Sequence, residues 1–66
     1  GGVNDFGKEV RRRLSEAGCW FVRHGHGDHD IWRSPHADKP FTVPIKIKSR
    51  HTANKIMKDA RLPKAF

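Results

Sequence analysis

Three histidines lie close together near the middle of this 66-residue chain, and they are the residues best suited to chemistry. His24, His26 and His29 alternate with two glycines and an aspartate in the stretch His24-Gly25-His26-Gly27-Asp28-His29. An imidazole with a pKa near ~6.5 can accept or donate a proton at neutral pH, and it can also bind a metal ion. The stretch therefore predicts either acid–base catalysis or metal binding.

The spacing of this stretch fits the pattern H-x-H-x-D-H, which resembles the metal-ligand signature of the metallo-β-lactamase fold. That resemblance implies zinc and a hydrolase. The same fold needs several times this length and further His and Asp ligands downstream, whereas only His36 and His51 follow here. We therefore expect no metal site and no cofactor, and keep a zinc hydrolase as an alternative.

The histidine stretch has the composition of a turn between two strands. Cys19 to Arg23 is aromatic and β-branched and predicts a strand, residues 24–27 supply two turn glycines, and Asp28 to Ser34 predicts a second strand. In the second strand His29, Ile31 and Arg33 share one face, and Asp30 and Trp32 share the other. Either Ile31 or Trp32 can be the buried anchor. Of the aromatic residues Trp20, Phe21 and Trp32, we expect at least two in the core.

Two helices are predicted to support this hairpin. Asn4 or Asp5 can cap a first helix that ends at Gly18, and Ser49 can cap a second helix that ends at Leu62-Pro63. The apolar residues of each helix recur at helical spacing. These are Phe6, Val10, Leu14 and Ala17 in the first helix, and Ala53, Ile56, Met57 and Ala60 in the second.

A third strand is predicted at Phe41–Pro44, after a proline-containing loop over residues 34–40. The alternating Ile45-Lys46-Ile47-Lys48 either extends that strand or forms an extended connector. The element order is then α-β-β-β-α. We expect one α+β domain over residues 1–66, with a three-stranded antiparallel sheet and both helices on one face.

The charge of the chain indicates a polyanionic partner. Lys and Arg number 14 against 7 Asp and Glu, which gives a net charge of +7. No apolar run approaches the ~20 residues of a membrane-spanning helix, and the first residues do not resemble a signal peptide. The single Cys19 fits a reducing compartment, so we expect a cytoplasmic protein without membrane association.

Short motifs in a fixed order make most of the chain, residues 8–66, similar to the HicA (YcfA-like) family of bacterial mRNA-cleaving toxins. The family motif Gly-Ser-His followed by a hydrophobic strand corresponds here to Gly27-Asp28-His29 and the residues after it, with Asp28 in place of the usual Ser. The other matching segments are Glu9 to Leu14, Ala17-Gly18, Val22-Arg23, Thr42-Val43-Pro44 and Ser49 to Leu62.

This resemblance implies a fold like the double-stranded-RNA-binding domain, an RNase activity on mRNA, and inhibition by a HicB-type antitoxin in the bacterial cytoplasm. The family's catalytic histidine corresponds to His29. An alignment that assigns the catalytic role to His26 is also possible, but the residues after His26 then no longer match the family's hydrophobic strand. Gly27 and Asp28 form the turn, and Asp28 or Asp30 could orient the imidazole.

RNA cleavage also needs cations for the phosphate. We expect these to be Lys46, Lys48 and Arg50, then Arg23, Arg33 and Lys55. The run Arg11-Arg12-Arg13 either contacts phosphate or forms a solvated helix face. The alternative from a different class is a non-catalytic RNA-binding module that uses the same basic surface.

Overall fold

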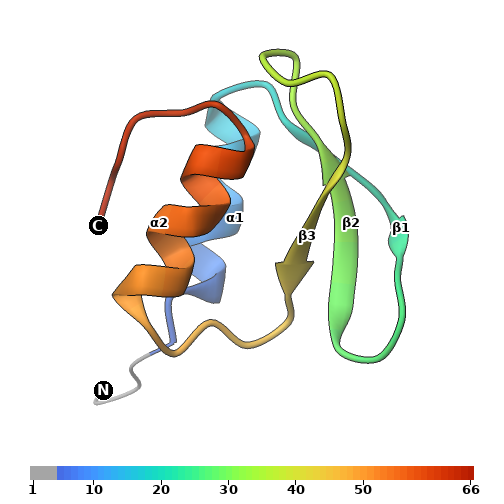
Figure 1. Cartoon of the computed structure of the whole chain (residues 1–66). Helices are drawn as coiled ribbons and strands as arrows, with labels where there is room; N and C mark the ends of the chain where they lie inside the picture. Colours follow the sequence, from blue (N-terminus) through green and yellow to red (C-terminus); the bar gives the residue numbers. More distant parts are fainter. Residues whose placement is uncertain (1–4) are drawn as a thin grey trace.

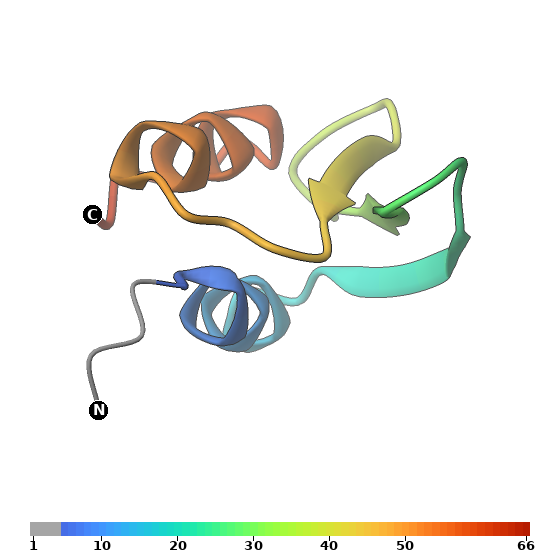
Figure 2. The same ribbon diagram turned by 90° about the horizontal axis from the view of Figure 1, so that it is seen from below.

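A computed structural model describes residues 5–66 and has the order α-β-β-β-α (Figure 1). The elements are α1 (Gly7–Glu16), β1 (Trp20–His24), β2 (His29–Arg33), β3 (Phe41–Pro44) and α2 (Arg50–Asp59). The strands form one antiparallel sheet in the order β1-β2-β3. Both helices lie on the same side of this sheet, as expected from the sequence, and the other face stays open (Figure 2).

Helix α1 begins and ends with backbone groups that find partners outside the helix. The cap residue is Phe6, one position after the predicted Asp5, but the Asp5 carboxylate still accepts the Gly7 N–H at 2.8 Å. The other predicted cap, Asn4, lies outside the described residues. At the far end Gly18 has a φ of +91°, and the Cys19 N–H reaches the Leu14 carbonyl at 2.9 Å. This is the expected glycine-ended helix terminus.

Strand β1 is more exposed than the sequence predicts. All five of its residues are exposed, and Trp20 and Phe21 keep 47% and 45% of their surface. The expectation that at least two of the three aromatics lie in the core is therefore wrong, because β1 is at the sheet edge and extends past the helices. The register also shifts between Phe21 and Arg23, which leaves Val22 as the extra residue of a bulge.

Strand β2 carries the central anchor of the sheet. Trp32 is 7% exposed and Ile31 is half-buried, so Trp32 is the inward residue. The Trp32 indole N–H has no hydrogen-bond partner among the described residues. Just after β2, the buried Ser34 hydroxyl donates to the Ala60 carbonyl at 2.7 Å, which ties the end of the strand to the end of α2.

Residues 45–48 form a connector and do not extend β3. Ile47 is buried, its carbonyl accepts the Phe6 N–H at 2.6 Å, and its own N–H donates to Asp5 Oδ1 at 3.1 Å. The connector therefore runs beside the beginning of α1. Ser49 caps α2, as predicted, by accepting the Thr52 N–H at 3.3 Å.

The core lies between the helices and the inner face of the sheet. Helix α2 contributes a large share of it, since Ala53, Ile56, Met57 and the cap residue Ala60 are all buried. The remaining buried apolar residues are Val10, Leu14, Cys19, Trp32, Phe41, Val43 and Ile47. Because the core spans both helices and the sheet, it fixes the hairpin that carries the histidines.

Candidate active site

The turn between β1 and β2 is tightly hydrogen-bonded and presents His29 at the start of β2. The Gly25 N–H donates to the His29 carbonyl at 2.8 Å, and the His29 N–H donates to the His26 carbonyl at 3.3 Å. Gly27 lies in this turn and takes a φ of +60°, a value that most side chains disfavour.

His29 lies on the open face of the sheet. Its neighbour Asp30 is buried and faces the helices, so the alternation of the strand directs the exposed His29 the other way. Across the sheet His29 pairs with Pro44, and the next N–H, from Ile45, donates to the Asp28 carbonyl at 2.7 Å. The start of the connector is therefore fixed beside this histidine.

The imidazole that meets a carboxylate belongs to His24. His24 Nδ1 lies 2.8 Å from Asp30 Oδ1, and Asp30 is 8% exposed whereas the His24 side chain is 83% exposed. Asp30 Oδ2 is also 3.7 Å from the guanidinium of Arg11, which donates to the Pro44 carbonyl at 2.9 Å. The suggestion that Asp30 orients His29 is therefore wrong, because Asp30 points to the opposite face.

Asp28 forms its hydrogen bond with the connector through its backbone carbonyl. Its carbonyl accepts from Ile45, and among residues 5–66 its carboxylate has no hydrogen-bond partner. Sequence reasoning missed the pair of His24 and Asp30. The alternation of side chains along β2 already separated Asp30 from the face of His29. Which residue of β1 meets Asp30 depends on the register between the two strands, and the bulge in β1 shifts that register.

Most of the predicted cationic residues gather at one end of the molecule with the histidine turn. The turn, the connector and the beginnings of both helices lie together at the bottom of Figure 1. Lys46 and Lys48 are exposed in the connector, and Arg50 is the first residue of α2. Arg23 is the penultimate residue of β1, next to the turn. Lys55 lies further along α2, and Arg33 is at the far end of β2, where it donates to the Asp38 carbonyl at 3.2 Å.

The three consecutive arginines of α1 are engaged within the protein. Arg11 contacts Asp30 and Pro44, Arg12 pairs with Glu9 and Glu16, and Arg13 pairs with Glu9 at 3.0 Å. The hydrogen bond from Arg12 holds the pKa of the Glu9 carboxyl below its usual value. This arrangement supports the helix-face interpretation of the run rather than a phosphate site.

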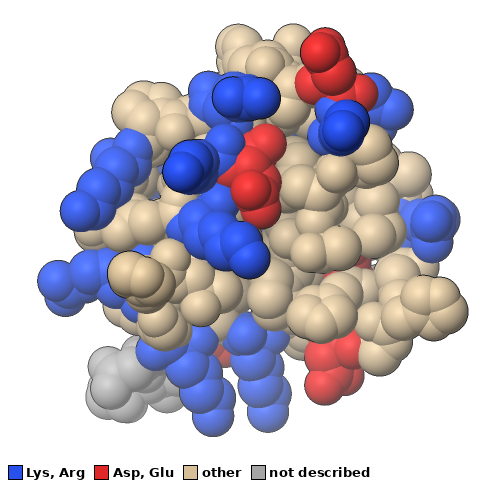
Figure 3. Space-filling view, viewed as in Figure 1, with Lys and Arg blue, Asp and Glu red and all other residues tan. Residues whose placement is uncertain are grey.

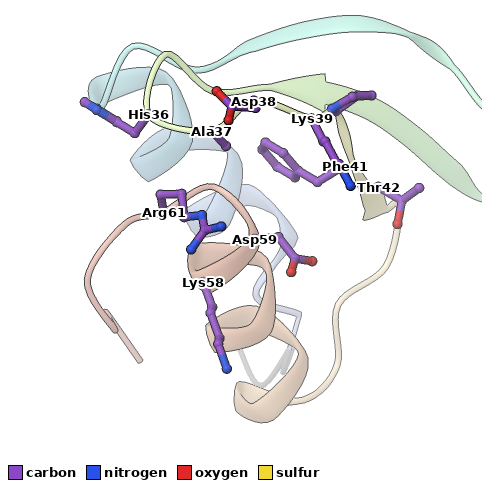
Figure 4. Close-up of a pocket in the computed structure, with 10 residues that line it drawn as sticks. His36, Ala37, Asp38, Lys39, Phe41, Thr42, Lys58, Asp59 and Arg61 are labelled. Atoms are coloured by element: carbon purple, nitrogen blue, oxygen red, sulfur yellow. The ribbon is translucent and has the colours of Figure 1, made fainter.

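Two further features lie apart from the histidine turn. Within residues 5–66, no three His, Cys, Asp or Glu side chains converge so that they could hold a metal ion, so this part of the chain offers no ready ligand set for the zinc alternative. A shallow hollow lies between the loop before β3 and the end of α2 (Figure 4). It mixes both charges, with Asp38, Lys39, Lys58, Asp59 and Arg61, and contains none of the predicted site residues.

The charged side chains are unevenly distributed over the surface that Figure 3 shows. In Figure 3 many Lys and Arg side chains lie over the helices and along the lower edge, while the charged side chains on the sheet side lie mainly around its rim. No helix of the described chain combines the length and the apolar character needed to cross a membrane.

Comparison with known proteins identifies the family. A family model described as the HicA toxin of bacterial toxin–antitoxin systems matches residues 7–62, which cover every helix and strand of the fold. No curated protein and no solved structure matches the chain. With the match extending from the first residue of α1 to beyond the end of α2, the chain belongs to the HicA toxin family of bacterial toxin–antitoxin systems.

Proposed function

We propose that this protein is an endoribonuclease that cleaves mRNA, with His29 as its acid–base residue. The observation that carries the proposal is the position of His29. It is exposed on the open face of the sheet, at the start of β2, next to a connector that carries Lys46 and Lys48. Membership of the HicA toxin family supports the same activity.

The chemistry needs only groups that this chain supplies. Neutral His29 accepts the proton of an RNA 2′-hydroxyl, whose oxygen then attacks the neighbouring phosphorus. The bond from phosphorus to the 5′-oxygen breaks, and the imidazolium returns a proton to that leaving oxygen. Lysine and arginine side chains at the same end of the molecule stabilise the charge that develops on the phosphate.

A single histidine that serves both proton transfers makes a simple catalyst. Much of the rate then comes from holding the RNA in the correct orientation. The hydrogen bonds of the turn support that role, because they hold the backbone at and before His29. Gly27 contributes by accepting the positive φ that the turn requires.

The partner that restrains this activity is, in our proposal, an antitoxin that covers His29 and the cations near it. The chain has a net charge of +7, so an antitoxin surface with acidic side chains would complement it. Both proteins would act in the bacterial cytoplasm, where mRNA is the available substrate.

The test is a growth assay in bacteria that express the wild type or one of three variants. We expect the wild type, His24→Ala and His26→Ala to arrest growth and degrade mRNA, and His29→Ala to do neither. The three histidines are all exposed, so the variants form a matched set. Circular dichroism of the purified proteins checks that each one folds.

Other outcomes would reassign the chemistry. Loss of arrest in His24→Ala, with His29→Ala still active, would move catalysis to the pair of His24 and Asp30. Equal arrest by all four proteins without mRNA loss would indicate a non-catalytic RNA-binding module.

A further inference from the structure

The open face of the sheet carries an aromatic residue and cations on the same side as His29. Residues that pair directly across antiparallel strands project to the same face. Trp20 pairs with Arg33, and Arg23 pairs with Ile31. Since Arg33 and Ile31 share a face of β2 with His29, Trp20 and Arg23 lie on that face as well.

This face leaves a large aromatic side chain exposed beside cationic residues. Trp20 keeps 47% of its surface exposed, although burying an aromatic side chain normally stabilises a small protein. The outward positions of β2 and their partners on β1 hold two arginines and a histidine but no carboxylate. The one acidic residue of β2, Asp30, faces the helices.

We propose that this face binds single-stranded RNA, with the base of one nucleotide stacked on the Trp20 indole and the phosphate beside it held by Arg33. The inference rests on the proposed ribonuclease function and specifies its substrate as unpaired RNA. Stacking on a sheet needs splayed bases, which a duplex does not offer.

The geometry gives the path of the RNA. Arg33 is four residues from His29 along β2, which corresponds to roughly 13 Å at the rise of a strand. The strand bound at His29 therefore runs along β2 toward Trp20, and Arg23 lies between the two ends. The stacked base belongs to a nucleotide near the cleaved bond but separate from it.

Two observations favour RNA over a protein strand added to the edge of β1. The bulge at Val22 interrupts the regular ladder that an added strand would need. The net charge of +7 also opposes pairing with a second copy of this chain.

The experiment measures binding of a labelled oligonucleotide of roughly ten residues by fluorescence anisotropy. Its 2′-hydroxyls are replaced by methoxy groups, so it cannot be cleaved by the proposed route. We expect Trp20→Ala to weaken binding roughly 5- to 100-fold and Trp20→Phe to retain most of the affinity. The matched duplex should bind more weakly than the single strand, with no effect of Trp20→Ala.

Phe21→Ala is the control, because Phe21 is in the same strand and is 45% exposed but lies on the other face. Its ring meets Trp32 at 6.3 Å between centroids, and Trp32 is buried on the helix side. We expect this variant to bind the single strand like the wild type. Thermal unfolding of each variant separates a loss of binding from a loss of fold.

The proposal is overturned if Trp20→Ala binds the single strand as tightly as the wild type, or if it weakens duplex binding equally. Unchanged RNA affinity together with weaker binding of the antitoxin would make the face a protein interface. These readouts do not depend on cleavage. The ribonuclease proposal can therefore fail through His29→Ala while the binding result stands, and the reverse also holds.

Discussion

Asp30 and His24 form the one carboxylate–imidazole hydrogen bond in residues 5–66, with 2.8 Å between Oδ1 and Nδ1. The carboxylate is buried, the imidazole is exposed, and the pair joins the end of β1 to the centre of the sheet. An acceptor at Nδ1 places a proton on that nitrogen and leaves Nε2 free toward solvent. The pair therefore fixes the tautomer of an accessible histidine.

Replacing Asp30 tests this pair. We expect Asp30→Ala to lower the free energy of unfolding by about 1–3 kcal/mol, because the Arg11 guanidinium and the His24 N–H lose a charged acceptor. Imidazole nitrogen shifts in NMR spectra should show His24 with a proton on Nδ1 in the wild type and a mixture of tautomers in the variant. The spectrum of His29, on the other face, should stay unchanged.

A change confined to stability, with the same His24 tautomer in both proteins, would contradict the pairing. Asp28→Ala is the matched control, since its carboxylate is exposed and has no partner in the described residues. It should affect neither the tautomer of His24 nor the unfolding curve.

The two glycines with positive φ should differ in their tolerance of a side chain. A left-handed backbone costs about 1–2 kcal/mol for most residues, so both Gly18→Ala and Gly27→Ala are destabilising. At Gly18 the new Cβ also meets the Pro35 ring at 3.3 Å, whereas at Gly27 no atom of the described residues lies within 4 Å of it. We expect Gly18→Ala to be the more damaging of the two in urea denaturation, and equal midpoints would refute the contact with Pro35.

Asp5 should make the stability of the protein depend on pH in the acid range. Its pKa is lowered from 3.8, first by the hydrogen bond from the Gly7 N–H and then by the one from Ile47. A carboxyl whose folded pKa is depressed stabilises the fold fully above its unfolded pKa, and that contribution is lost as the pH falls through the lower folded value. Asp5→Ala should therefore be less stable than the wild type at neutral pH, with the difference shrinking in acid.

Urea denaturation of both proteins at neutral pH and below pH 3.8 measures this effect. Asp5→Asn keeps an acceptor oxygen without the charge, so its stability should lie between the two. Glu9 has a lowered pKa as well, and Glu9→Gln controls for its share of the acid dependence. A constant difference between wild type and Asp5→Ala across this range would contradict the assignment.

Trp32 should tolerate phenylalanine better than its burial suggests. Its indole N–H is buried and has no hydrogen-bond partner within residues 5–66, so removing that group relieves a desolvation cost while most of the ring volume remains. We expect Trp32→Phe to cost less than about 1.5 kcal/mol and Trp32→Ala about 3–5 kcal/mol. Thermal unfolding distinguishes them, and a cost for Trp32→Phe close to that for alanine would show that the indole N–H has a partner.

The local signals in the sequence were sufficient for the order of elements. Gly18, Gly27 and Ser49 mark a helix end, a turn and a helix start, and each has that place in the structure. Helical spacing also identified most of the core of α1 and α2. These features depend on residues close together in the chain.

The features that could not be predicted depend on residues far apart in the chain. Asp5 binds the Ile47 N–H across 42 positions, and the extent of the helices leaves Trp20 and Phe21 uncovered. The bulge at Val22 sets which residue of β1 faces Asp30. Periodicity within a strand specifies two faces but not the neighbour that each face meets.

The packing of α2 has a consequence for the order in which the protein folds during synthesis. This helix is made after α1 and the three strands, and it supplies Ala53, Ile56, Met57 and Ala60 to the core shared with these elements. Until α2 leaves the ribosome, Val10, Leu14 and Trp32 lack the apolar side chains that this helix contributes to their common core. A ribosome-bound chain that lacks α2 therefore leaves the inner face of the sheet without one of its two covering helices, and the sheet and α1 reach their final packing only after this helix has been made.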